Sequence, residues 1–257
     1  MIKIPKNPSK KFVYHLLEEQ YEAFNHYHSI TTDLPDPLGV ARQFISDKVA
    51  LFCALFAYGN ARAIVRFLES CNLYFLEQTS YKSYHNLHLN EIPYCTNKPY
   101  RFQNQDEIQD FFESLLMSGN LYEIFYRAYK KDSLLKGIEA LQNHLYNNLQ
   151  NTTKGLEFLI GKPQSNSPLK RWNMFLRWMV RKDCIDLGFW EGIRRSDLIL
   201  PLDTHTFRVS QKLGILKRKS YDLKAALEVS EFLKKLDSKD PIKYDFALYR
   251  IGQLGLI

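Results

Sequence analysis

The sequence KRWNMFLRWMVR, residues 170–181, sets the interpretation of the whole chain. At 100° per residue, Lys170, Met174, Arg177 and Arg181 fall on one side of a helix, and large apolar residues fall on the other. The pattern predicts a helix with one face in the core and one basic face. Lys170 would lie in the first turn, where backbone N–H groups and the helix dipole favour a phosphate.

Helical periodicity continues through most of the 257 residues, and alternating runs bounded by hairpin turns are almost absent. We therefore expect an all-α fold. Residues 79–104, rich in Tyr, His, Asn and Pro, form the least regular stretch. The predicted helices are 9–28, 38–57, 60–77, 105–117, 120–128, 132–149, 153–160, 169–182, 187–195, 204–214, 222–236 and 241–254.

Helix-capping signals mark several of these helices. Asp203 precedes THTFRV as a natural N-cap, and capping alone is one interpretation of this carboxylate. Asp240 and Pro241 suit the cap and the first position of the last helix, which Gly252 or Gly255 can end.

The net charge of +7 is concentrated in one segment. Residues 162–195 include eight basic and three acidic residues, which gives this segment a net charge of +5. This favours a polyanionic partner such as nucleic acid, although membrane surfaces and acidic proteins attract similar charge.

Four scattered cysteines, Cys53, Cys71, Cys95 and Cys184, form no CxxC pair, and no histidine lies at metal-ligand spacing. We expect no metal, no iron–sulfur cluster and no cofactor. The first residues lack an uninterrupted apolar signal region, and no apolar run is long enough to span a bilayer. These features predict a cytoplasmic protein with free thiols and no membrane partner.

Lys170 and Asp203, 33 positions apart, are the candidate reactive pair. A lysine amine can attack a sugar carbon, and a carboxylate can take its proton and stabilise a developing sugar cation. Neither residue alone justifies a catalytic role, because a helix face with a lysine and two arginines is ordinarily only a solvated surface.

The segments GLEFLIGKPQSNSPLKRWN and LPLDTHTFRVSQKLG resemble the helix–hairpin–helix DNA glycosylase superfamily. Lys170, Asn173 and Leu176 fall where the superfamily has its Schiff-base lysine and the following Asn and Leu. The chain as a whole resembles a bacterial family without assigned function and is most similar, within the superfamily, to the archaeal 8-oxoguanine DNA glycosylases, which share the long Lys-to-Asp separation. The residues matching the signature around the catalytic aspartate are Pro201, Leu202, Asp203, Thr204, His205, Arg208, Val209, Leu213 and Gly214.

The resemblance covers residues 38–257 and implies a two-lobed fold with the active site in a cleft. The lobes would span approximately 38–150 and 151–257, with segment 1–37 packing on the second. The chain departs from the superfamily in its hairpin, where GKPQSNSP lacks the usual glycine-rich form. It also lacks the C-terminal four-cysteine cluster of the iron–sulfur branch.

The resemblance assigns Lys170 and Asp203 to catalysis and Asp245, Tyr249 and Met174 to the pocket for a flipped base. Each pocket residue has an alternative: Tyr249 and Met174 as core, and Asp245 as part of an exposed first helical turn. Among the implied DNA contacts, Asn60 is alternatively a helix N-cap and His205 a structural residue. The implied DNA contacts are Asn60, Arg62, Lys162, Gln164, Ser165, Asn166, Ser167, Arg177, Arg181 and His205.

The implied activity is excision of a damaged base, 8-oxoguanine above others, from double-stranded DNA by a monomeric enzyme at the nucleoid. Cleavage of the abasic site by β-elimination (AP lyase activity) would follow through a lysine imine. Two alternatives remain: a monofunctional glycosylase for alkylated or mismatched bases, which uses Asp203 and water, and a non-catalytic DNA-binding protein.

Overall fold

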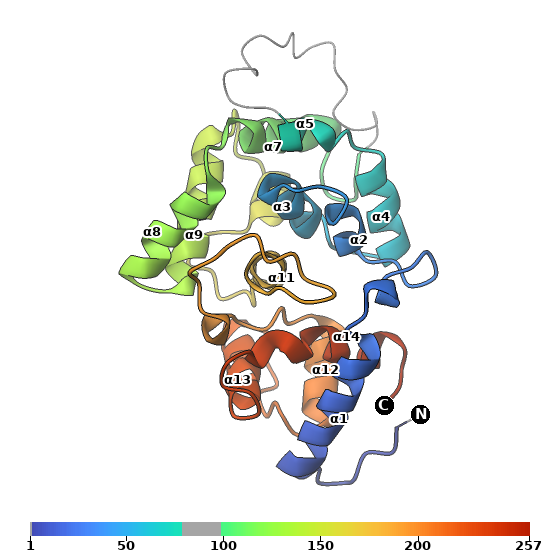
Figure 1. The fold of residues 1–257 in the computed structure, drawn as a ribbon. Helices are drawn as coiled ribbons and strands as arrows, with labels where there is room; N and C mark the ends of the chain where they lie inside the picture. Colours follow the sequence, from blue (N-terminus) through green and yellow to red (C-terminus); the bar gives the residue numbers. More distant parts are fainter. Residues whose placement is uncertain (1, 79–98) are drawn as a thin grey trace. The chain divides into compact units, whose positions relative to one another are not determined.

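The computed structural model describes residues 2–78 and 99–257, and within these ranges the protein is all-α, as predicted (Figure 1). No strand forms among the described residues. Two isolated bridges, Tyr100–Gln103 and Lys182–Leu187, are the only β-type pairings there.

The chain divides into two compact units. Unit 1 comprises Met1–Ser29 and Asn166–Ile257, and unit 2 comprises Ile30–Ser165. The division after Ser165 differs from the predicted one at 150/151, because helix α10 (Lys154–Ile160) belongs with the helices that precede it.

Unit 2 is built around α3 (Asp47–Leu55), whose residues from Val49 to Leu55 are all buried. The ring of Phe52 packs on those of Phe111 and Phe112, which α7 contributes. The other helices of this unit are α2 (Pro37–Ala41), α4 (Ala61–Glu69), α5 (Tyr74–Gln78), α7 (Gln105–Met117), α8 (Leu121–Lys131), α9 (Leu134–Asn148) and α10.

Unit 1 joins the N-terminal helix to residues 166–257. In it, α1 (Lys10–Phe24) packs on α14 (Asp245–Gln253), and α14 packs on α12 (Thr204–Lys212), as Figure 1 shows. The last contact is close, since a Cβ at Gly252 would lie 2.8 Å from the Cβ of His205. The remaining elements are η1 (Tyr27–Ser29), α11 (Lys170–Val180), η3 (Arg195–Asp197), α13 (Leu223–Lys234) and η4 (Pro241–Tyr244).

Several predicted helices were wrong in extent or kind. The predicted helix 9–28 ends at Phe24 and is followed by the 3₁₀ turn η1, and the predicted helix 60–77 is two helices, α4 and α5. The predicted helix 38–57 is two helices, because the Ser46 side chain caps a new start at α3. Residues 187–195 are not α-helical and lead into the short 3₁₀ turn η3. The last predicted helix opens as the 3₁₀ turn η4, because the Asp240 carboxylate binds Arg181 and does not cap.

Cys53 and Cys184 are free thiols, whereas Cys71 is disulfide-bonded, so the expectation of free thiols throughout was wrong at that position. Most of the irregular stretch 79–104 lies outside the described residues. Within the described part of the chain, none of the helices has both the length and the apolar character needed to cross a membrane.

Candidate active site

Lys170 opens α11, as predicted, and is partly exposed. The preceding residue, Leu169, has left-handed backbone (φ 50°) and provides no side-chain cap. Asn173 stabilises this turn instead: its buried side-chain N–H donates to the carbonyl of Pro168 at 3.0 Å. The conformation that places Lys170 in the first helical turn is therefore held from one turn further along the helix.

The basic face predicted for α11 is not exposed. Residues from Trp172 to Val180 are all buried, including Arg177, and Arg181 just after the helix is buried as well. The prediction that Arg177 and Arg181 hold DNA phosphates was wrong, because both guanidinium groups are bound by carboxylates inside unit 1.

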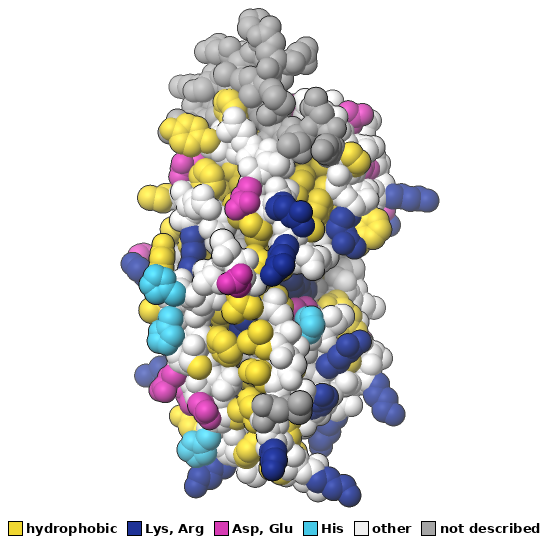
Figure 2. Space-filling model, turned by 90° about the vertical axis from the view of Figure 1, so that its right-hand side faces the viewer, with side chains coloured by type: hydrophobic (Ala, Val, Ile, Leu, Met, Phe, Trp, Pro, Cys, Tyr) yellow, Lys and Arg dark blue, Asp and Glu magenta, His cyan; other side chains and the backbone are white. Residues whose placement is uncertain are grey.

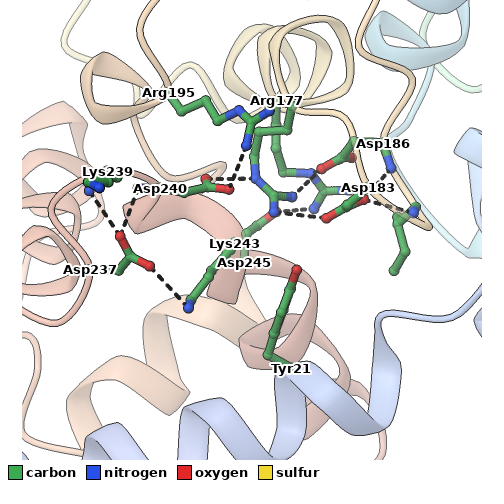
Figure 3. Close-up of polar contacts among 12 residues, drawn as sticks. Tyr21, Arg177, Asp183, Asp186, Arg195, Asp237, Lys239, Asp240, Lys243 and Asp245 are labelled. Atoms are coloured by element: carbon green, nitrogen blue, oxygen red, sulfur yellow. Dashed lines mark hydrogen bonds and ion pairs between the residues drawn. The ribbon is translucent and has the colours of Figure 1, made fainter.

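These contacts form a buried network of ion pairs (Figure 3). Asp186, whose side chain is fully buried, bridges the two arginines: it accepts from Arg177 Nε at 3.1 Å and from Arg181 Nη1. Arg181 also binds Asp183 at 2.8 Å and Asp240 at 2.9 Å. Burial in an apolar interior requires such pairing, since an unpaired charge there is very costly.

Asp203 caps α12, as its sequence context predicts. The carboxylate accepts a hydrogen bond from the backbone N–H of Thr206 at 2.8 Å. The backbone just before it is held by Tyr221, whose hydroxyl donates to the carbonyl of Leu202 at 2.7 Å. Burial and the nearby Asp203 charge raise the pKa of Tyr221 to about 12, so this hydroxyl keeps its proton at neutral pH. Asp203 is thus a fixed, partly exposed carboxylate.

The candidate base-pocket residues have different environments. Asp245 is buried at the start of α14 and pairs with Arg177, so the alternative of an exposed first-turn aspartate was wrong. Tyr249, one turn later, is half-buried, and its ring meets that of His205 edge-on at 6.2 Å. Met174 is buried, in agreement with its interpretation as a packing residue.

The carboxyl of Asp245 on α14 pairs with Arg177 on α11, and α14 packs on α12. Burial raises the pKa of Asp245 to about 6, Arg177 opposes this rise, and the charges of Asp203 and Asp186 add to it. In contrast, no hydrogen bond or ion pair within the described residues joins Lys170 to Asp203.

The predicted DNA contacts in unit 2 form a separate group. Asn60 caps α4, with its side-chain oxygen accepting from the backbone N–H groups of Arg62 at 3.0 Å and Ala63 at 3.3 Å. Its N-cap interpretation is confirmed, and Asn60 and Arg62 are both exposed. Gly59 needs its positive φ of 107°, and a Cβ there would meet the Arg101 side chain.

The loop between α10 and α11 crosses from unit 2 to unit 1. In unit 2, Lys162 pairs with Glu157 at 3.1 Å, and the Gln164 side chain donates to Glu139 at 2.7 Å. The backbone N–H of Ser165 donates a hydrogen bond to the backbone carbonyl of Lys162. In unit 1, Asn166 accepts from the N–H of Leu223, and Ser167 accepts from the N–H of Leu169. The loop is held by specific contacts along its length.

Sequence reasoning missed the acidic partners of the arginines. Asp186 lies nine residues from Arg177, and Asp245 lies 68 residues from it, so local spacing carried no sign of either pair. The concentration of arginines among apolar residues in α11 was a usable signal, since charges on a buried helix require partners. On the surface, Figure 2 shows other Lys and Arg side chains interspersed with hydrophobic and neutral ones on the face drawn.

A family model described as a protein of unknown function (DUF2400) matches residues 36–254, and the chain belongs to this family. Neither curated proteins nor solved structures gave a match.

Proposed function

We propose that this protein is a DNA glycosylase with AP lyase activity that removes 8-oxoguanine from double-stranded DNA. The grouping of three helices around Asp245 carries the proposal. Arg177, from the helix that Lys170 opens, binds Asp245 on α14, and α12, which Asp203 caps, packs on α14. One unit thus contains a lysine at a helix start, a fixed carboxylate and a half-buried tyrosine, which together support excision chemistry.

In the proposed reaction, the lesion leaves the base stack and is held by Asp245, Tyr249 and Met174. The amine of Lys170 attacks C1′ of the sugar, and the glycosidic C–N bond breaks as its electron pair goes to the base, which takes up a proton. Asp203 stabilises positive charge on the sugar and accepts the proton lost by the amine. A sugar placed between the two side chains requires space, so their lack of direct contact is compatible with this reaction.

The C1′–O4′ bond then breaks, O4′ takes the proton held by Asp203, and the nitrogen lone pair forms a protonated imine that joins Lys170 to C1′ of the opened sugar. Loss of a proton from C2′ then expels the phosphate on the 3′ side, which cleaves the strand. Such an enzyme would have the two-lobed helix–hairpin–helix glycosylase fold and act as a monomer on nucleoid DNA in the cytoplasm. Asn60, Arg62, the loop at 162–167 and His205 are its proposed DNA contacts.

Borohydride trapping tests the proposal. Purified protein is incubated with duplexes that each carry one lesion, borohydride is added, and covalent adducts and released bases are measured. The wild type should form an adduct with the 8-oxoguanine duplex. Lys170→Ala should lose both adduct and base release, whereas Lys224→Ala, which removes an exposed lysine elsewhere in unit 1, should retain both.

The other outcomes identify the alternatives. Base release without an adduct indicates a monofunctional glycosylase that uses Asp203 and water. Binding with a steep salt dependence and no release of any base indicates a non-catalytic DNA-binding protein. A Lys170→Ala protein that still forms the adduct would exclude the proposed nucleophile.

A further inference from the structure

The two oxygens of the Asp245 carboxyl have different environments. Oδ2 accepts a hydrogen bond from Nη1 of Arg177. No described residue donates a hydrogen bond to Oδ1. The Asp245 side chain is only 6% exposed. Of its two oxygens, Oδ2 is therefore bound within the protein, and Oδ1 is an acceptor without a partner in the described chain.

Arg177 is itself fixed on two sides. Its Nε donates to Asp186 at 3.1 Å, and its guanidinium carbon lies 5.9 Å from the ring centre of Phe246, the residue next to Asp245. A planar guanidinium can hold two carboxylates in a set geometry at once, which the single ammonium of a lysine does not reproduce. Arg177 therefore determines the orientation of Asp245 as well as compensating its charge.

We infer that Arg177 is a positioning residue that orients Asp245 so that its Oδ1 accepts a hydrogen bond from an N–H group on the edge of the bound base. This inference rests on the proposed function. It assigns the pocket to bases that present N–H donors on that edge, as guanine-type bases do with N1–H and the 2-amino group. A site that hydrogen-bonds a substrate N–H discriminates strongly against analogues that lack it, because its own polar group is then left unpaired.

Arg177→Lys tests the inference, with Arg181→Lys as the matched control. Arg181 shares Asp186 with Arg177 and is equally buried, but its carboxylate partners are Asp186, Asp183 and Asp240. Both variants are compared with the wild type at equal folded fraction. The readouts are the single-turnover rate of 8-oxoguanine release and the borohydride adduct with a duplex that already contains an abasic site.

Arg177→Lys should slow base release by about ten- to one-hundred-fold, the factor for losing a hydrogen bond to a charged group. Its adduct with abasic DNA should stay near the wild-type level, because that substrate has no base to recognise. Arg181→Lys should change either readout by less than about two-fold. Normal base release by Arg177→Lys, or equal losses in both variants, would overturn the inference and leave the proposed function intact.

Asp245→Asn provides an independent variant should Arg177→Lys not fold. It should lose base release to a similar extent and keep the adduct with abasic DNA. Adding Arg177→Lys to it should cause no further loss, since both changes act on one contact. Independent, multiplicative losses would overturn the inference. A wild type that neither releases the base nor forms an adduct with abasic DNA would instead refute the proposed function itself.

Discussion

Replacing Asp186 with alanine removes the carboxylate that bridges the two buried arginines. Arg177 and Arg181 retain only 5% and 4% exposure of their side chains, so water cannot replace the lost partner. Breaking a buried ion pair from one side costs about 3–5 kcal/mol. Because Arg177 keeps Asp245, and Arg181 keeps Asp183 and Asp240, we expect the lower end, about 3 kcal/mol.

A loss of this size is a large part of a typical unfolding free energy of about 5–15 kcal/mol. At about 2–4 °C per kcal/mol for a protein of this size, the melting temperature should fall by roughly 6–12 °C. Thermal unfolding followed by circular dichroism and by calorimetry measures the shift.

The matched control is Arg194→Ala, which breaks a pair with Asp197 in the same unit. The Arg194 side chain is 77% exposed, and exposed pairs contribute little, so its melting temperature should change by less than about 2 °C. A melting temperature of Asp186→Ala that matches this control would refute the reasoning, because it would mean that the two arginines are not held as a buried network.

Two further predictions separate structural from chemical roles. The folded protein binds the Asp245 proton more tightly than the unfolded chain, so this group's contribution to stability is complete below about pH 4 and is lost as the pH rises through about 6. The unfolding free energy of Asp245→Asn relative to the wild type should therefore rise by about 3 kcal/mol between pH 4 and pH 7. A difference in unfolding free energy that does not change with pH would contradict the burial of the Asp245 carboxyl. Asp203→Asn should keep its stability within about 0.5 kcal/mol, because Asn caps helices as well as Asp, while base release falls by at least about one-hundred-fold; unchanged release would reduce Asp203 to a cap.

Local signals in the sequence predicted much of the fold. The helical period and the capping residues Asp203 and Asn60 act on backbone only a few positions away in the sequence. They could therefore be recognised without knowledge of tertiary contacts. Asp240 shows the limit of this approach. Its context predicts a cap, but its carboxylate binds Arg181, 59 positions earlier, and a 3₁₀ turn takes the place of the expected helix start.

For the candidate site, the sequence selected residues but did not predict the environments in which the structure places them. The motif context selected Lys170, Asp203, Asp245 and Tyr249, and the structure places all four in unit 1. A helical wheel assigns polar residues to the exposed face by default. For Arg177 this assignment is wrong. The side chain is buried, because the carboxylates that pair with it come from segments outside the helix.

The same long-range pairs change what the net charge means. In sequence, residues 162–195 carry +5 and suggest a basic surface for DNA. In the folded chain, Glu157, Asp197, Asp240 and Asp245 come from outside this segment and bind its basic side chains. These four carboxylates offset most of the excess, so much of the local charge stabilises the protein and contributes little to an external field. Affinity for DNA, if the proposed function holds, must then depend on individual contacts near Lys170 and the loop before it.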